Sequence, residues 1–141
     1  MRSIVAKGST NKHGQILIRL NDVNSLSKNE WEFKVSSLVI SPLLNDVESH
    51  IFELGCSLNT TECFDYTRNV FMDKNTPMCL LFVNCRKNLS QKIELSDSVC
   101  PWLKIENVKD IVEVTFFDPG TSNAVPKDMF YVTLHLWIRR K

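Results

Sequence analysis

Alternating hydrophobic and polar residues dominate the chain, whereas the spacing of an amphipathic helix is scarce. The clearest alternation runs from Glu30 to Ile40 and predicts a strand that covers a core with one face. The predicted core face of this strand comprises Trp31, Phe33, Val35, Ser37 and Val39. The opposite face turns apolar only at Leu38 and Ile40, so that end can be buried on both sides. Pro42 is expected to end the strand, because proline cannot donate to a central ladder.

The C-terminal segment carries the second clear alternation. One face is purely apolar and predicts a row of core residues, namely Phe130, Val132, Leu134, Leu136 and Ile138. The other face mixes aromatic rings with a hydroxyl, an imidazole and a cation, which favours a subunit interface or a wet surface over a core. The expected interface residues are Tyr131, Thr133, His135, Trp137 and Arg139.

Shorter alternations and turn residues divide the rest of the chain. Val112–Phe117 predicts a strand that the loop Asp118–Asp128 joins to the C-terminal strand. Further short strands are expected at Gln15–Leu20, Ile51–Ser57, Met78–Cys85, Lys92–Leu95 and Trp102–Ile105. The polar segment Asn59–Lys74 predicts a long loop with room for one helical turn. About eight strands and few helices predict an all-β fold, a single antiparallel β-sandwich domain over residues 1–141. A jelly roll is the first expectation and an immunoglobulin-like sandwich the alternative.

Composition narrows the class of protein without naming a function. The chain has 141 residues, 43% of them hydrophobic and 23% charged, as in an ordinary single globular domain. Its formal net charge is +1, which argues against general nucleic-acid binding, since such binding depends on neutralising phosphates. No apolar run approaches the ~18 residues that a membrane span requires.

The candidates for chemistry are sparse. Five cysteines occur without a Cys-x-x-Cys pair, so we expect buried free thiols. A charge at Lys7 interrupts any apolar core of a signal peptide, so we expect the protein to be made in a reducing cytosol. The sequence has no nucleophile elbow, phosphate-binding glycine motif or histidine ligand pair. We therefore expect no catalytic, cofactor or metal site, although a Cys–His pair could still meet in space. Trp31 and Trp102 are expected to be core aromatics.

Segments at both ends of the chain share a pattern with one group of capsid proteins. At the start these are Gly14–Leu20 (GQILIRL), Asn29–Val35 (NEWEFKV) and then Pro42. At the end they are Ile111–Gly120 (IVEVTFFDPG), Val125-Pro126 and Val132–Arg140 (VTLHLWIRR). Together they resemble the capsid proteins of Polinton (Maverick) elements, adintoviruses and their relatives. This chain is much shorter than the typical Polinton capsid protein.

The resemblance implies a non-enzymatic jelly-roll structural protein of a virus-like particle. It would be a penton-like capsid subunit or a trimeric attachment-head subunit, located in the virion or the host cytoplasm. Its partners would be copies of itself, with a trimer as the first expectation, and also other capsid proteins or a host receptor. The alternative is a monomeric β-sandwich binding module for a glycan, a lipid or a host protein.

Overall fold

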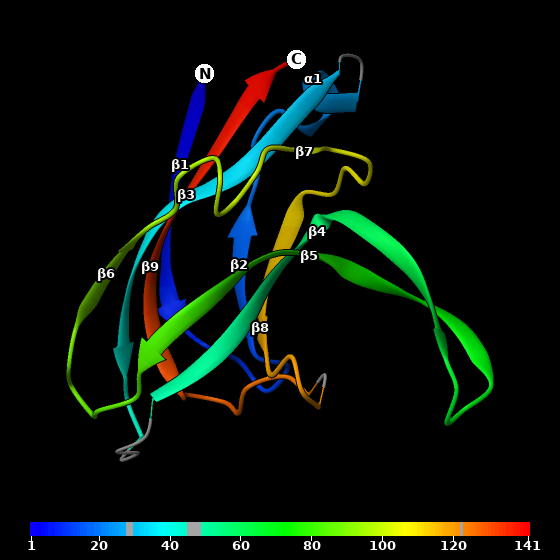
Figure 1. Ribbon diagram of the computed structural model, residues 1–141. Coiled ribbons are helices and arrows are strands. Elements are labelled where there is room, and N and C mark those ends of the chain that lie inside the picture. Colours follow the sequence, from blue (N-terminus) through cyan, green and yellow to red (C-terminus); the bar gives the residue numbers. More distant parts are fainter. Residues whose placement is uncertain (28–29, 45–48, 122) are drawn as a thin grey trace.

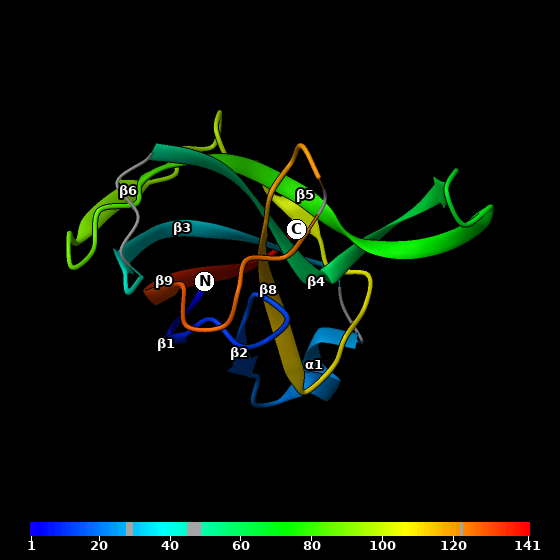
Figure 2. The same cartoon turned by 90° about the horizontal axis from the view of Figure 1, so that it is seen from below.

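The computed structural model describes residues 1–27, 30–44, 49–121 and 123–141, which form two antiparallel sheets packed face to face (Figures 1 and 2). The first sheet, sheet A, contains β1 (Arg2–Ser9), β9 (Phe130–Arg140), β3 (Trp31–Pro42), β6 (Gln91–Glu94) and β7 (Leu103–Lys104). The second sheet, sheet B, contains β2 (Gln15–Arg19), β8 (Ile111–Phe117), β4 (Ser49–Asp65) and β5 (Val70–Asn84). The described part of the chain has one short helix, α1 (Val23–Ser27).

The strand pairs are nested around one hairpin. β4 pairs with β5, β3 with β6 and β7, β2 with β8, and β1 with β9, all antiparallel. The resulting orders are β1-β9-β3-β6 and β2-β8-β4-β5, with β7 continuing the edge that β6 begins. This is the arrangement of a double-sheet jelly roll and differs from the immunoglobulin grouping. The expected all-β, jelly-roll-like sandwich is confirmed.

The core is built around the inner face of β9. The predicted row on that face is completely buried, and it comprises Phe130, Val132, Leu134, Leu136 and Ile138. The Phe130 ring meets two rings of sheet B edge-on, with centroid distances of 5.1 Å to Phe52 and 6.2 Å to Phe116. Such edge-to-face pairs add to the stabilisation from burial. The alternation of β9 therefore predicted the centre of the molecule correctly.

The predicted faces of β3 are correct only in its first half. Phe33 and Val35 point into the core, as expected. The register with β9 then shifts between Val35 and Ser37, which marks a β-bulge. A bulge adds one residue to one strand, so the alternation reverses beyond it. Leu38 and Ile40 consequently join the core, and the predicted core positions Ser37 and Val39 lie half-buried on the outer face.

Two further features of the sheets were not predicted from the sequence. The chain begins with β1, which pairs with β9 and was not predicted, because its inner face offers little more than Ile4 and Ala6. The loop Asp118–Asp128 joins β8 to β9, as expected, but it crosses from sheet B to sheet A. Pairing of β1 with β9 also explains why the two termini lie side by side at one end of the molecule (Figure 1).

Candidate functional site

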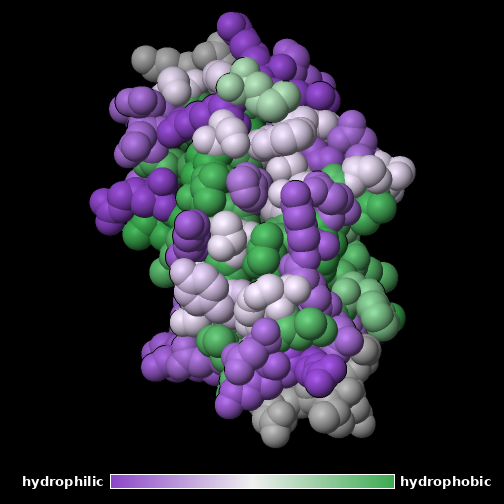
Figure 3. All heavy atoms as spheres, turned by 90° about the vertical axis from the view of Figure 1, so that its left-hand side faces the viewer, coloured by the Kyte–Doolittle hydropathy of each residue, from purple (hydrophilic) through white to green (hydrophobic). Residues whose placement is uncertain are grey.

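The five predicted interface residues share the outer face of β9, opposite the core row. Tyr131 has 44% of its surface exposed, and Thr133, His135, Trp137 and Arg139 are half-buried. Figure 3 views the molecule from the side on which sheet A lies in Figure 1, and hydrophobic atoms there are interspersed with hydrophilic ones. The sequence thus grouped these residues correctly, although their role in assembly stays a prediction.

One end of this face is covered by the chain itself. The ring of Trp102 stacks on Trp137 with a centroid distance of 6.5 Å and an interplanar angle of 27°. The guanidinium of Arg139 lies 3.8 Å from the centroid of the Trp102 ring, and its Nε donates to the carboxylate of Glu32. Trp102 is therefore a cover over the outer face, and the expectation that it belongs to the core is wrong. Trp31, by contrast, packs half-buried against the core.

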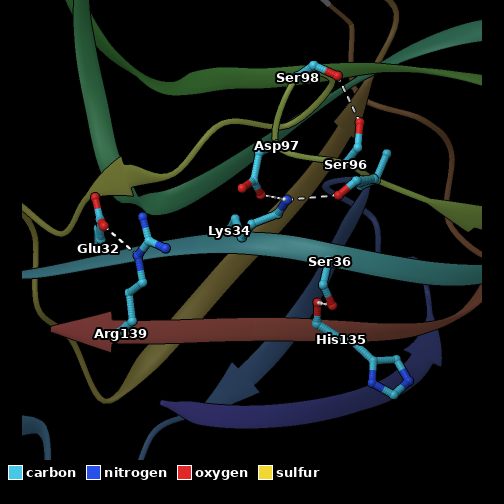
Figure 4. Close-up of polar contacts among 9 residues, drawn as sticks. Glu32, Lys34, Ser36, Ser96, Asp97, Ser98, His135 and Arg139 are labelled. Atoms are coloured by element: carbon cyan, nitrogen blue, oxygen red, sulfur yellow. Dashed lines mark hydrogen bonds and ion pairs between the residues drawn. The ribbon is translucent and has the colours of Figure 1, made fainter. Parts of the chain in front are cut away.

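A buried lysine holds this cover in place (Figure 4). Lys34 is only 2% exposed, and its Nζ donates to the Leu95 carbonyl and to Asp97 Oδ1, both at 2.8 Å. The hydrogen bond from Lys34 lowers the pKa of the Asp97 carboxyl below its ordinary value, and a hydrogen bond from Trp102 adds to this. Lys34 thus supplies the hydrogen-bond donors for two acceptors of the segment between β6 and β7, where that segment leaves the edge of β3. The open part of the β9 face is the end that carries Tyr131.

A second surface is a hairpin arm, which we define as residues 60–75. Asn59–Lys74 was expected to be a loop, but β4 and β5 continue their pairing through it, up to Asp65 opposite Val70. The register shift after Cys56 lets the fully buried Leu58 anchor the base of the arm in the core. Beyond this point the hairpin extends away from the two sheets (Figures 1 and 2).

Polar contacts fix the base of the arm to the body. The Asn107 side chain donates to Thr60 Oγ1 at 3.0 Å, and the Asn75 side chain donates to Thr115 Oγ1 at 3.1 Å. The ammonium of Lys74 lies 4.5 Å from the centroid of the Phe117 ring. These contacts orient the arm while leaving its outer end beyond the core.

The outer end of the arm is an aromatic cluster in water. The Phe64 ring contacts Tyr66 at 5.1 Å and Phe71 at 4.9 Å between centroids. Tyr66 and Phe71 remain 89% and 70% exposed. The Asp65 side chain accepts hydrogen bonds from the backbone of Thr67 and Arg68 and so forms the turn. The alternation of Phe64 and Tyr66 was a signal for this hairpin that sequence reasoning missed.

An open cleft of about 790 Å³ lies between the arm and the end of β8. The arm contributes Phe64 and Met72 to its lining, whereas the body contributes Phe117, Asn123 and Ala124. This mixture of apolar surface and a few polar groups is typical of a binding groove. The cleft and the aromatic cluster adjoin, so one partner could contact both.

The remaining observations concern the cysteines, metal ligands, membrane spans and the comparisons with known proteins. Four cysteines are buried and Cys63 is half-buried, and none of the five is in a disulfide. Residues 1–27, 30–44, 49–121 and 123–141 contain no group of three potential ligands arranged for a metal ion, and no helix in these ranges could cross a membrane. No protein-family model and no curated protein matches this chain.

Proposed function

We propose that this protein is a non-enzymatic structural subunit that assembles with copies of itself in a virus-like particle. It would serve as a penton-like capsid subunit or an attachment-head subunit, with a trimer as the simplest assembly. It would act in the virion or the host cytoplasm, beside other capsid proteins or a host receptor.

The observation that carries self-assembly is the aromatic arm. A two-stranded hairpin is only marginally stable in water without a further strand or a packed face. Here the arm leaves the body and holds the rings of Tyr66 and Phe71 in solvent. Aromatic side chains at the centre of an interface contribute most of its affinity. A neighbouring subunit that covered these rings would stabilise both the arm and the assembly.

The outer face of β9 offers a second contact. Its open end presents Tyr131, Thr133 and His135, because the cover formed by Trp102 reaches only the end that carries Trp137. We expect Tyr131 to lie nearer the centre of this contact than Trp137. The polar atoms of these side chains suit an interface that is wet at its rim.

The capsid or attachment role rests on two supports. One is the resemblance of both ends of the chain to capsid proteins of Polinton-like elements. The other is the jelly-roll order of the strands, an architecture that viral capsid domains use. Lectin domains use it too, so the fold supports this role only by analogy.

Light scattering behind a sizing column tests self-assembly directly. At micromolar concentration the protein should have a mass near a small multiple of 16.3 kDa, with three as the first expectation. Replacing both exposed rings, Y66S with F71S, should return the mass to that of one chain. The control is L17S, which removes an apolar side chain that is 53% exposed on the outer face of β2. A monomeric wild type would end the assembly proposal.

The cleft favours a second candidate, a monomeric binding module for a glycan, a lipid or a host protein. In that case the wild type would be monomeric, and F117A would weaken ligand binding without changing the mass. A glycan array read with the purified protein gives the first search for such a ligand.

A further inference from the structure

The strand at one edge of sheet B contains a stretch without charge. β5 pairs with β4 on one side, and in the described part of the chain no strand pairs with its other side. Residues 78–83 of β5 (MCLLFV), which we call the open edge, include no charged residue and no proline. The other edge strands, β1, β2, β6 and β7, all carry charges, at Arg2, Lys7, Arg19, Lys92, Glu94 and Lys104. Charges on an edge strand discourage pairing with another chain, and the open edge lacks this protection.

Both ends of the open edge are protected against pairing. Pro77 precedes it and has no backbone N–H to donate to a further strand. At the other end, the Gln91 side chain accepts a hydrogen bond from the Asn84 N–H at 2.8 Å and donates one to the Asn84 carbonyl at 2.7 Å. Gln91 thus occupies the backbone of Asn84 as a neighbouring strand would. The protection fails only between these two points.

The contact between Asn84 and Gln91 also identifies the backbone groups that face outward. In an antiparallel pair, alternate residues hydrogen-bond to the partner strand, and the residues between them turn their N–H and C=O away from it. Asn84 turns its backbone to Gln91, and the register with β4 is unbroken from Asn84 to Cys79. Phe82 and Leu80 therefore turn their backbone groups to the same side. In the ranges that the structure describes, no residue outside β4 hydrogen-bonds to the backbone of either one.

The same two residues place apolar side chains beside these groups. Leu80 and Phe82 are 58% and 67% exposed on the outer face of sheet B. Ile51 of β4 lies opposite Phe82 and is 51% exposed, so the three side chains form one apolar row. Such a row beside an unpaired backbone suits an extended, apolar and uncharged partner strand. β5 of a second copy has these properties and brings no like charge into the contact.

We propose that β5 pairs antiparallel with β5 of a second copy, so that the two B sheets join into one. A twofold axis at Leu81 places Leu80 of each copy opposite Phe82 of the other. Each of these pairs would exchange both backbone hydrogen bonds of an antiparallel ladder. This register uses the outward groups of Leu80 and Phe82 and leaves the contact between Asn84 and Gln91 intact. A twofold contact of this kind closes after two copies.

This contact goes beyond those proposed for the arm and for the outer face of β9. A single short strand pair is a small interface, so we expect weak pairing between separate chains, with a Kd of about 0.1–1 mM. Where subunits are already held together, the effective concentration of edges is higher, and the same contact would join neighbouring assemblies. That role in a particle rests on the proposed function, whereas the pairing of two edges does not.

Sedimentation of the full chain over a concentration series tests the pairing. The Y66S and F71S double variant lacks the proposed arm contact, and its mass should rise from one chain to two between about 1 µM and about 1 mM. In that background, L80K and F82K should each raise the Kd at least about tenfold, because both copies then carry a charge at the edge. The matched control is L17K, which adds the same charge at a side chain that is 53% exposed on β2 and should leave the Kd unchanged.

The wild type separates this proposal from the assembly proposed above. If the arm contact forms, the wild type is already an oligomer at micromolar concentration, and its mass should grow further with concentration. If the arm contact fails, the wild type should pass from one chain to two like the double variant. A mass that stays constant up to about 1 mM would overturn the pairing of edges in either case.

Amide hydrogen exchange, followed by NMR, locates the contact. On association, the N–H groups of Leu80 and Phe82 should exchange at least about tenfold more slowly, because each gains an acceptor. The N–H of Leu81 already faces β4 and should change less. F82P removes one outward N–H without touching the ladder to β4, so it should abolish the pairing in a folded chain. Pairing that survives F82K, or protection at a different edge strand, would overturn the proposal.

Discussion

The body of the sandwich and the arm are built from the same pair of strands, yet they differ in what they bury. Within the body, β4 turns Phe52 and Leu54 into the core. In the arm the same ladder of hydrogen bonds continues, but Phe64 and Phe71 meet mainly one another and water. Backbone pairing alone can therefore extend a strand, whereas packing against the second sheet decides how much that strand contributes to the stability of the fold.

The largest expected effect comes from replacing one phenylalanine in the body and one in the arm. F130A should lower the free energy of unfolding by about 3–5 kcal/mol, because it removes a fully buried ring that meets two others. F71A should cost less than about 0.5 kcal/mol, since its ring is largely exposed. Urea denaturation of dilute monomer measures both values. Equal costs would mean that the arm packs as tightly as the body.

Replacing Lys34 removes the contacts that hold the Trp102 cover over the outer face of sheet A. K34A should cost about 2–4 kcal/mol, because it leaves a cavity and deprives the Leu95 carbonyl of its donor. K34M fills the volume without a charge and should cost less than K34A. Thermal or urea unfolding gives the ranking. A more severe loss in K34M than in K34A would contradict the idea that the packed volume of the Lys34 side chain contributes to stability.

Substitution of two tryptophans at the outer face of β9 distinguishes an effect on assembly from an effect on folding. If Trp137 contacts a neighbouring subunit, W137A should weaken assembly by about 2 kcal/mol or more while the fold survives. W102A removes the same stacking from the other side and should affect folding more than assembly. Mass in solution and melting temperature, measured for both variants, distinguish the roles. If W137A costs about 3–5 kcal/mol of folding stability with an unchanged mass, the ring serves only the fold.

The smallest expected effect concerns pH. Lys34 lowers the pKa of Asp97, so this carboxylate contributes stability above the ordinary aspartate pKa of about 3.9 and loses it as pH falls through the lower pKa of the folded state. The melting temperature of D97N should therefore lie slightly below that of the wild type at pH 7 and converge with it in acid. Because Asp97 is largely exposed, added salt should also shrink the difference. A gap that persists in strong acid would point to a contact other than the ion pair.

The alternation of β9 and of the first half of β3 was sufficient to predict the sandwich and its central row. In these segments the inward residues are apolar and the outward ones are polar or amphipathic, so a single register satisfies the core. The grouping of Tyr131, His135 and Trp137 on one face follows from the same period of two. Their contacts do not follow from it, since Trp102 comes from a distant segment.

The remaining features depended on the tertiary structure. The bulge in β3 reverses its faces, and nothing in the local pattern at Ser36 distinguishes a bulge from regular pairing. The arm became a hairpin because β4 and β5 already pair in the body, so each further hydrogen bond extends an existing ladder. The sequence by itself determined which residues of β9 and of the first half of β3 avoid water, whereas long-range pairing decided which of them touch.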